Sequence, residues 1–290
     1  MKTKHLRLMQ RVYIILFFCF MYLPIAYMIV FSFNQSKGYS LFTGFTFKWY
    51  RSLFTNASIL HALWVSVEVA VLSAIIATVL GTAASLGIAS MSRKSRLLVT
   101  NITYIPVVNP EIITGISLML LFVAYQRFAE GVSWLPDTIM GFPTLLIAHI
   151  TFNLPYVILN VLPKLRQMDR FTFEAAQDLG CSPKLAFYKV VIPEIMPGMV
   201  SGFLMAFTYS LDDFVISYFV SSASSQTLPV TIFSMVRKRV SPEINAISTL
   251  LFVTVILLLA IINIRENHHS HHAHHAAEAG ADDERGDLHF

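Results

Sequence analysis

The chain has 290 residues, of which 55% are hydrophobic and only 13% are charged, and its formal net charge is +4. Soluble proteins carry about 25% charged residues, so this composition predicts a helical protein embedded in a lipid bilayer and excludes a large soluble domain. The small net charge gives no reason to expect a nucleic-acid partner. A transmembrane barrel is the poorer alternative, because short strands of alternating hydrophobicity are not evident.

Apolar runs of about 20 residues are long enough to cross a bilayer as helices. Six of them predict an all-α, polytopic membrane protein with spans near residues 12–33, 62–90, 98–124, 142–162, 198–220 and 245–264. The first run follows a basic N-terminus, as in a signal peptide. We expect an uncleaved span, because the run is long and no small-x-small cleavage pattern follows it.

The distribution of Lys and Arg orients these spans. With the N-terminus inside, the predicted cytoplasmic segments hold 14 of these residues and the outer loops hold 7. Cytoplasmic loops carry such an excess, so we expect a multi-pass protein of the inner or plasma membrane with both termini in the cytoplasm. Cys19 and Cys181 then lie in different compartments, and no disulfide is expected.

Two spans carry distinctive packing residues. The second span has many small residues between Ala70 and Gly87, which allow close approach of helices. The third span contains Pro106 and Pro110, and proline removes a backbone hydrogen bond and kinks a helix. In lipid, the freed carbonyl groups need a neighbour or a water-filled cavity. The kink therefore indicates either a packing feature or a bent helix beside a pathway.

The largest predicted cytoplasmic loop, residues 163–197, reads as two short helices. Gly180 suits a left-handed helix C-cap. Ser182 is a good N-cap, and Pro183 is a favoured first helical residue. We expect the second helix to end at Pro193, before the chain returns to the membrane. Periodicity alone leaves open an amphipathic helix that rests on the membrane surface.

Seven residues of this loop carry a resemblance to a known family. They are Glu174, Ala175, Ala176, Gly180, Val190, Ile192 and Pro193. Their spacing, between the fourth and fifth spans, resembles the EAA loop of permease subunits of binding-protein-dependent ABC importers. The chain departs conservatively from that pattern at Val190 and Ile192, where the family has Ile and Leu. The resemblance implies that the loop forms a coupling helix that fits a groove on an ATPase subunit.

The resemblance covers nearly all of residues 10–265. Within the family, the chain is most similar to the second permease subunit of spermidine/putrescine importers. Further matching segments are residues 45–54, 109–122, 149–158, 207–220 and 228–249. It implies a type I six-span permease domain over residues 1–265. The implied partners are a second, homologous permease, an ATPase dimer that holds ATP and Mg²⁺, and an extracytoplasmic polyamine-binding protein. No cofactor is expected in this chain, which has no Walker-type segment of its own.

A polyamine path would need carboxylates for the ammonium groups and aromatic faces for cation–π contact. Acids within a span are costly and usually face the bundle interior. The acidic candidates are Glu68, Glu111, Asp212 and Asp213, and the aromatic candidates are Tyr22 and Trp49. Neighbouring helical residues point about 100° apart, so we expect at most one of the two aspartates to face the path directly, with Asp213 the first candidate. Helix packing is the alternative for each candidate.

Three other features complete the sequence prediction. His149, inside the fourth span, is expected to hydrogen-bond a neighbouring helix rather than carry protons. The basic run Arg237, Lys238 and Arg239 lies on the predicted outer side, and we expect it to dock the binding protein unless it is simply a solvated loop. Residues 266–290 are polar and rich in His, and they predict a disordered cytoplasmic tail to which we assign no metal site.

Several functions stay open at this point. A permease of the same kind could carry another substrate, such as Fe(III) or thiamine. A proton-coupled secondary transporter would normally show its own coupling acids and an internal repeat, and no convincing repeat appears. No catalytic residues are predicted, because no catalytic set for an intramembrane enzyme is recognisable. An ATP-driven polyamine importer subunit is the favoured hypothesis.

Overall fold

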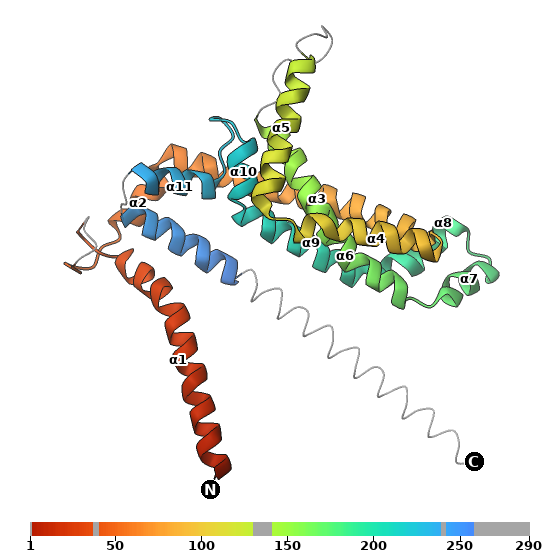
Figure 1. The fold of residues 1–290 in the computed structure, drawn as a ribbon, viewed down its shortest axis with the longest axis horizontal. Helices are drawn as coiled ribbons and strands as arrows, with labels where there is room; N and C mark the ends of the chain where they lie inside the picture. The colour runs from red at the N-terminus through yellow and green to blue at the C-terminus, as the bar shows by residue number, and fades with distance from the viewer. Residues whose placement is uncertain (1, 37–40, 130–140, 239–241, 258–290) are drawn as a thin grey trace. The chain divides into compact units, whose positions relative to one another are not determined.

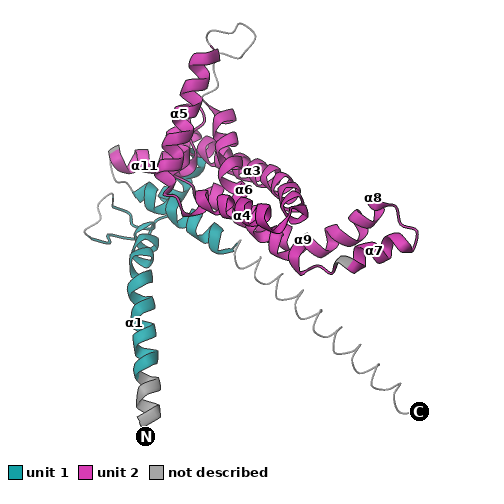
Figure 2. Cartoon of the chain, turned by 45° about the vertical axis from the view of Figure 1, so that its right-hand side comes forward, with its two compact units in different colours: residues 1–55, 239–290 teal, residues 56–238 magenta. Residues whose placement is uncertain are grey.

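The computed structural model describes residues 2–36, 41–129, 141–238 and 242–257. Almost all of these residues lie in helices, and none of them forms part of a strand, which confirms the all-α class. The chain divides into two compact units, residues 1–55 with 239–290 and residues 56–238 (Figure 2).

The first unit contains a long apolar helix and a short loop structure. Helix α1 (Lys2–Phe31) is the first predicted span, and α2 (Lys48–Thr55) follows a loop. The indole Nε1–H of Trp49 donates a hydrogen bond of 2.6 Å to the carbonyl oxygen of Asn34, which ties α2 to the residues just after α1. The described part of the sixth predicted span is a shorter apolar helix, Pro242–Leu257.

The second unit is built on three helices that lie side by side, α3 (Ala57–Ser90), α6 (Phe142–Gln167) and α9 (Ile192–Asp212) (Figure 1). The small residues of α3 face these neighbours, as predicted. A Cβ atom placed on Gly81 would lie only 2.6 Å from Cγ1 of Val157 in α6. The small side chains therefore let the backbones approach closely.

The third predicted span is two helices rather than one. Helix α4 (Arg93–Val108) contacts α6, whereas α5 (Glu111–Ala129) runs in another direction and packs against α10 (Val215–Val220) (Figure 1). The expectation of one kinked span over residues 98–124 was therefore wrong. The cause is local: Asn109 precedes a proline, which disfavours helical dihedral angles, and it is extended with ψ 136°.

The fifth predicted span, residues 198–220, is also interrupted. Helix α9 ends at Asp212, Asp213 is extended with φ −61° and ψ 122°, and α10 begins at Val215. Helix α11 (Leu228–Lys238) follows. The prediction of a continuous span was wrong here too, and the side chain of Asp213 supplies the reason described below.

The fourth and fifth spans are joined by α7 (Arg170–Asp178) and α8 (Pro183–Ala186). Helix α8 passes through a π-helical turn, Phe187–Val191, directly into α9. The second loop helix does not end at Pro193 as predicted, because the chain stays helical through the π turn, in which the N–H of Ile192, just before Pro193, donates to the carbonyl of Phe187. One helical rod of 30 residues, Pro183–Asp212, results, with a length of about 45 Å at 1.5 Å per residue.

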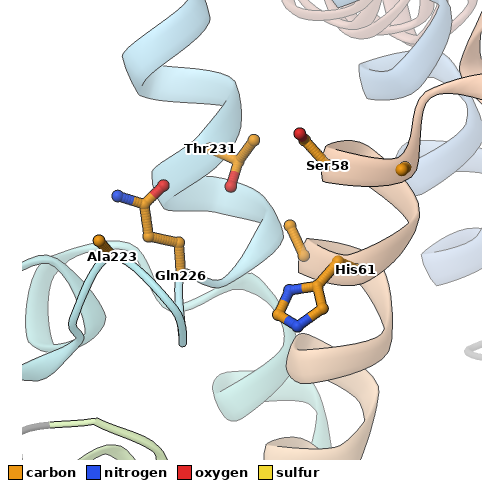
Figure 3. A pocket seen from close by; sticks show the side chains of 7 residues that line it. Ser58, His61, Ala223, Gln226 and Thr231 are labelled. Carbon is orange, nitrogen blue, oxygen red and sulfur yellow. The ribbon is translucent and has the colours of Figure 1, made fainter.

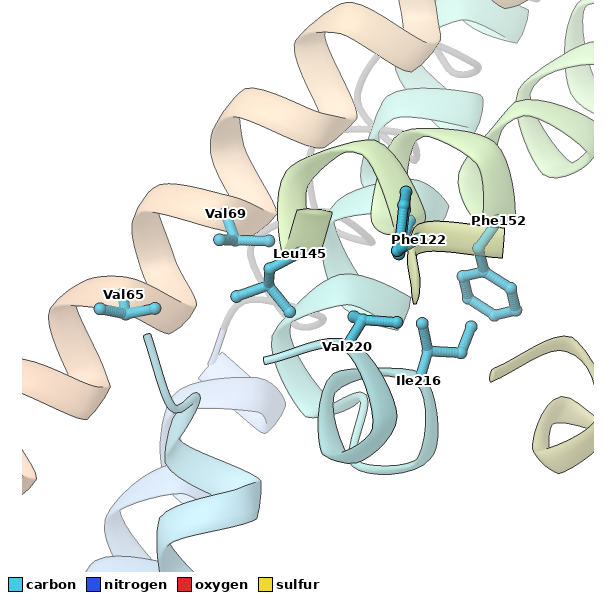
Figure 4. Packing of buried hydrophobic residues seen from close by; sticks show 8 residues of the cluster. Val65, Val69, Phe122, Leu145, Phe152, Ile216 and Val220 are labelled. Carbon is cyan, nitrogen blue, oxygen red and sulfur yellow. The ribbon is translucent and has the colours of Figure 1, made fainter. Parts of the chain in front are cut away.

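A buried apolar cluster forms where α3, α5, α6 and α10 meet (Figure 4). It includes Val69, Phe122, Leu145, Phe152 and Ile216. Within the described ranges, five helices are long and apolar enough to cross a membrane. They are Met9–Phe31, Ala57–Ser90, Glu111–Ala129, Phe142–Gln167 and Pro183–Asp212.

Candidate functional site

The two interrupted spans bring acidic residues together. Helix α5 begins at Glu111, and α10, which follows Asp212 and Asp213, packs against α5. A Cβ atom placed on Gly115, one turn after Glu111, would lie 3.5 Å from Cα of Ile216, so the start of α5 packs closely on the start of α10. Glu111 and Asp212 are exposed, whereas Asp213 is only 8% exposed. A surface that carries Glu111 and Asp212 therefore lies at the two helix breaks.

Asp213 has a structural task in the break itself. Its Oδ1 accepts a hydrogen bond of 3.2 Å from the backbone N–H of Ile216, and its Oδ2 accepts one of 2.7 Å from that of Ser217. Both donors belong to the first turn of α10, whose N–H groups have no helical carbonyl partner. The carboxylate therefore caps α10. This geometry favours Asp212 rather than Asp213 as the acid that is open to a ligand.

His149 of α6 contacts the capped start of α10. Its Nε2 lies 3.0 Å from Oγ of Ser217 and 3.5 Å from Oδ2 of Asp213. The ring is 1% exposed. The predicted hydrogen bond between helices is confirmed.

One turn along α6, a second polar cluster ties the three central helices together. The amide Nδ2 of Asn153 donates to Oγ of Ser210 at 2.7 Å and to Oγ of Ser73 at 3.2 Å. The two serine hydroxyl groups are 3.0 Å apart. This cluster joins α3, α6 and α9 and holds no charged group.

The sequence analysis missed two tyrosines, one of which, Tyr209, lies one turn before Asp212 in α9. The rings of Tyr156 in α6 and Tyr209 in α9 have centroids 4.6 Å apart, and Phe152 packs edge-on to both. The spacing of His149, Phe152 and Tyr156 along one helical face could have identified Tyr156, since residues three, four and seven apart share a face.

The other sequence candidates lie elsewhere. Trp49 is 5% exposed and its indole nitrogen bonds within its own unit, which supports a structural role. Tyr22 is exposed on α1, where it stacks on Phe18. Glu68 is half-buried in α3. Of the basic run, Arg237 is exposed near the end of α11.

Lys238 is the last residue of α11. Arg239 and the His-rich segment 266–290 lie outside the described residues, so the predictions made for them stay predictions.

The loop between α6 and α9 has the predicted helix caps. Gly180 adopts φ +88°, its N–H donates to the carbonyl of Gln177 at 2.8 Å, and the N–H of Cys181 donates to that of Ala176 at 3.1 Å. These two bonds form a Schellman motif. Oγ of Ser182 accepts from the N–H of Leu185 at 3.4 Å and caps α8. The predicted positive-φ cap and the predicted N-cap are both confirmed.

The same loop exposes apolar side chains. Leu179 is 88% exposed, and Phe171 and Tyr188 are also largely exposed, while Glu174 and Ala175 lie on the surface of α7. Side chains of this kind at the end of a helix bundle (Figure 1) form a surface suited to a protein partner.

A separate hollow of about 420 Å³ lies between the start of α3 and the residues before and within α11 (Figure 3). It is lined by Ala57, Ser58, His61, Ala62, Ala223, Gln226 and Thr231. Among the described residues, its wall carries polar side chains such as Ser58, Gln226 and Thr231 and no acidic one.

Long apolar helices, two interrupted spans that gather acids and tyrosines, and an exposed helical loop together define a polytopic membrane transport subunit. Residues 77–269 match the family model described as "Binding-protein-dependent transport system inner membrane component". The chain belongs to this family of inner-membrane permease components, which confirms the resemblance of its central loop.

Relatives of known name agree with this assignment. The chain is 40% identical over 242 residues to the putrescine transport system permease protein PotI of Escherichia coli strain K12, a match that covers 83% of this chain and 84% of the relative. It is 34% identical over 263 residues to the spermidine/putrescine transport system permease protein PotC of Haemophilus influenzae, with 90% and 98% coverage.

Among solved structures, the chain resembles one chain of a bacterial alginate ABC transporter, with a TM-score of 0.70 and 16% sequence identity. That transporter was solved in complex with a periplasmic protein bound to an alginate pentasaccharide. The match covers 90% of this chain and 92% of that chain. At this identity the likeness shows a shared fold, and it confirms the ABC importer permease architecture.

Proposed function

We propose that this chain is the permease subunit of an ATP-driven importer that takes up polyamines, such as putrescine or spermidine, from an extracytoplasmic binding protein. The names of the relatives at 34–40% identity support the substrate class. The observation that carries the proposal is the pair of exposed acids, Glu111 and Asp212, at two helix breaks joined by the packing of α5 on α10, with Tyr209 one turn before Asp212 and its ring against Tyr156.

This surface suits an extended chain of ammonium groups and methylenes. Glu111 and Asp212 offer negative charge to ammonium groups, and charge-assisted hydrogen bonds are the stronger kind. The faces of Tyr156 and Tyr209 offer cation–π contact and an apolar floor for methylenes.

The partners follow from two exposed surfaces. An acid on a span needs a water-filled path or a protein neighbour rather than lipid, so we propose that a second, homologous permease covers the surface with Glu111 and Asp212. We propose that an ATPase dimer binds the loop, with Glu174, Ala175, Ala176 and Gly180 near the contact and Pro193 in the part of the rod where α9 begins. ATP and Mg²⁺ would be held by that partner.

We further propose that both termini face the cytoplasm, as the distribution of Lys and Arg predicts. Single cysteines at Ser95 and Ser133, in a chain without Cys19 and Cys181, test this orientation. An impermeant thiol reagent added from outside should label position 133 and leave position 95 unlabelled, and the reverse pattern would refute the orientation.

The run Arg237, Lys238 and Arg239 is proposed to dock an acidic rim of the binding protein. Contacts of this kind act mainly on association and weaken with salt. Replacement of all three residues by Ser should raise the binding-protein concentration that gives half-maximal transport at low salt. An unchanged concentration at both low and high salt would argue for a solvated loop.

The decisive experiment reconstitutes the complete complex in liposomes with its ATPase, its second permease and its binding protein. We expect putrescine or spermidine to be taken up and to stimulate ATP hydrolysis. Uptake of thiamine or Fe(III) instead would show a permease of the same kind with another substrate. Uptake driven by a proton gradient without ATP would show a secondary transporter and overturn the proposal.

A further inference from the structure

The break between α9 and α10 depends on a single residue. Asp213 has ψ 122°, whereas Phe214 has helical dihedral angles, φ −105° and ψ −43°, and α10 continues from Val215. A helical ψ is about −42°. Rotation at Asp213 alone would therefore allow α9 and α10 to join as one continuous helix.

The side chain of Asp213 competes directly with that continuous helix. In an unbroken helix the N–H groups of Ile216 and Ser217 would donate to the carbonyl oxygens four residues earlier, at positions 212 and 213. In the structure both N–H groups donate to the carboxylate of Asp213, at 3.2 and 2.7 Å. The break persists as long as the carboxylate holds these two donors.

His149 is placed to hold the carboxylate. Its Nε2 lies 3.5 Å from Oδ2 of Asp213 and 3.0 Å from Oγ of Ser217, and both of these partners are buried. With the proton on Nε2, the ring donates to Oγ of Ser217 and turns the positive end of its N–H bond toward the carboxylate. A buried carboxylate that loses such a neighbour is less well compensated. His149 therefore acts on the one residue that decides between a broken and a continuous span.

We propose that His149 is a positioning residue, which holds Asp213 in its capping conformation and thereby sets the direction in which Asp212 enters the polyamine path. The inference rests on the proposed function, because it assigns Asp212 to that path. His149 itself touches no substrate. Its effect on transport should pass entirely through the break and the adjoining carboxylate of Asp212.

The test measures polyamine uptake per mole of assembled complex for His149→Ala, Asp212→Asn and the double variant. We expect His149→Ala to lower uptake about tenfold. When Asp212 is already Asn, the same change should lower uptake less than about twofold, because the effects of two substitutions that act through the same contact do not add. His149→Gln, which keeps an amide donor, should recover uptake to within about threefold of the wild type. The concentration of binding protein for half-maximal uptake should not change.

Asn153→Ala is the matched control, because it removes another buried polar side chain of α6 one turn away, with no contact to Asp213. It should lower the melting temperature while uptake per assembled complex stays normal. If His149→Ala behaves like this control, or if its effect multiplies with that of Asp212→Asn, the inference is overturned.

Two further outcomes separate the inference from the proposed function. Normal uptake in Asp212→Asn alone would refute the proposed path, and the inference with it, without any His149 variant. If His149→Ala fails to assemble, Ser217→Ala takes its place, because it removes only the hydroxyl group that contacts His149. Uptake is then compared for Ser217→Ala, Asp212→Asn and the double variant. An additive result there would likewise overturn the inference.

Discussion

The helices of the second unit satisfy their backbone groups in two different ways. Where α3, α6 and α9 lie side by side, the helices are continuous and glycines such as Gly81 and Gly202 meet Val157 of α6 at close range. At the breaks after Asn109 and Asp212, side chains and capping groups replace helical bonds. The first region can only pack in one way, whereas the second can exchange one set of hydrogen bonds for another.

The two regions are mechanically joined. The helical rod Pro183–Asp212 starts in the loop proposed to bind the ATPase and ends at the acid proposed to face the path. Ile195 and Gly198, in the middle of the rod, are buried against its neighbours. A displacement at the loop would therefore reach Asp212 through one continuous helix.

The largest effect is expected in the continuous region. Gly81→Ala places a Cβ atom 2.6 Å from Cγ1 and 2.8 Å from Cβ of Val157, a stiff β-branched side chain that is fully buried. Overpacking of this kind costs about 1–3 kcal/mol. We expect less assembled protein and a lower melting temperature in detergent.

Gly87→Ala in the same helix is the matched control, since nothing lies within 4 Å of the added Cβ atom. It should be neutral or stabilising by up to about 1 kcal/mol, because alanine favours the helix. Equal melting temperatures for the two variants would contradict the close packing of α3 on α6.

A smaller effect on stability, with a large one on coupling, is expected at the loop. Gly180 has φ +88°, and a β-branched residue is strained there by about 1–2 kcal/mol. Gly180→Val should insert in the membrane but lose most ATPase association and transport. Gly180→Asn should retain both, because asparagine tolerates left-handed conformations. Wild-type transport and co-purification in Gly180→Val would contradict the coupling role.

The smallest effect is expected for the aromatic floor. Tyr156→Leu removes one face for cation–π contact, which is worth about 0.5–1 kcal/mol at a partly exposed site. Polyamine uptake should fall roughly two- to fivefold, while Tyr156→Phe, which keeps the ring, should stay near the wild type. Equal uptake in Tyr156→Leu and the wild type would remove the aromatic contribution from the proposed path.

Local signals in the sequence predicted much of the fold. The apolar runs located the membrane-crossing segments, although two of these segments are interrupted. Gly180, Ser182 and Pro183 predicted the caps of the loop, because each motif acts within a few residues. Pro110 predicted a disturbance of the third span, although the sequence could not say whether the helix bends or stops.

The site depends on longer-range contacts. No proline or glycine lies between residues 203 and 220, so no local signal predicted a break between Asp212 and α10. The break exists because Asp213 finds the N–H groups of α10 and because His149, distant in sequence, lies against it. These tertiary contacts also explain why Asp213 is buried and Asp212 is exposed.

The neighbouring aspartates provide the most direct test of the central claim, that polyamine passes the acids at the helix breaks. Uptake per mole of assembled complex is measured for Asp212→Asn and Asp213→Asn, together with the melting temperature of each complex. Asp212→Asn should lose about ten- to a hundredfold in uptake with normal assembly, since a charge-assisted contact is worth about 1.5–3 kcal/mol. Asp213→Asn should lower assembly and melting temperature and, because the capped break sets the direction of Asp212, should also lower uptake per complex. Normal uptake per complex in Asp212→Asn would contradict the account.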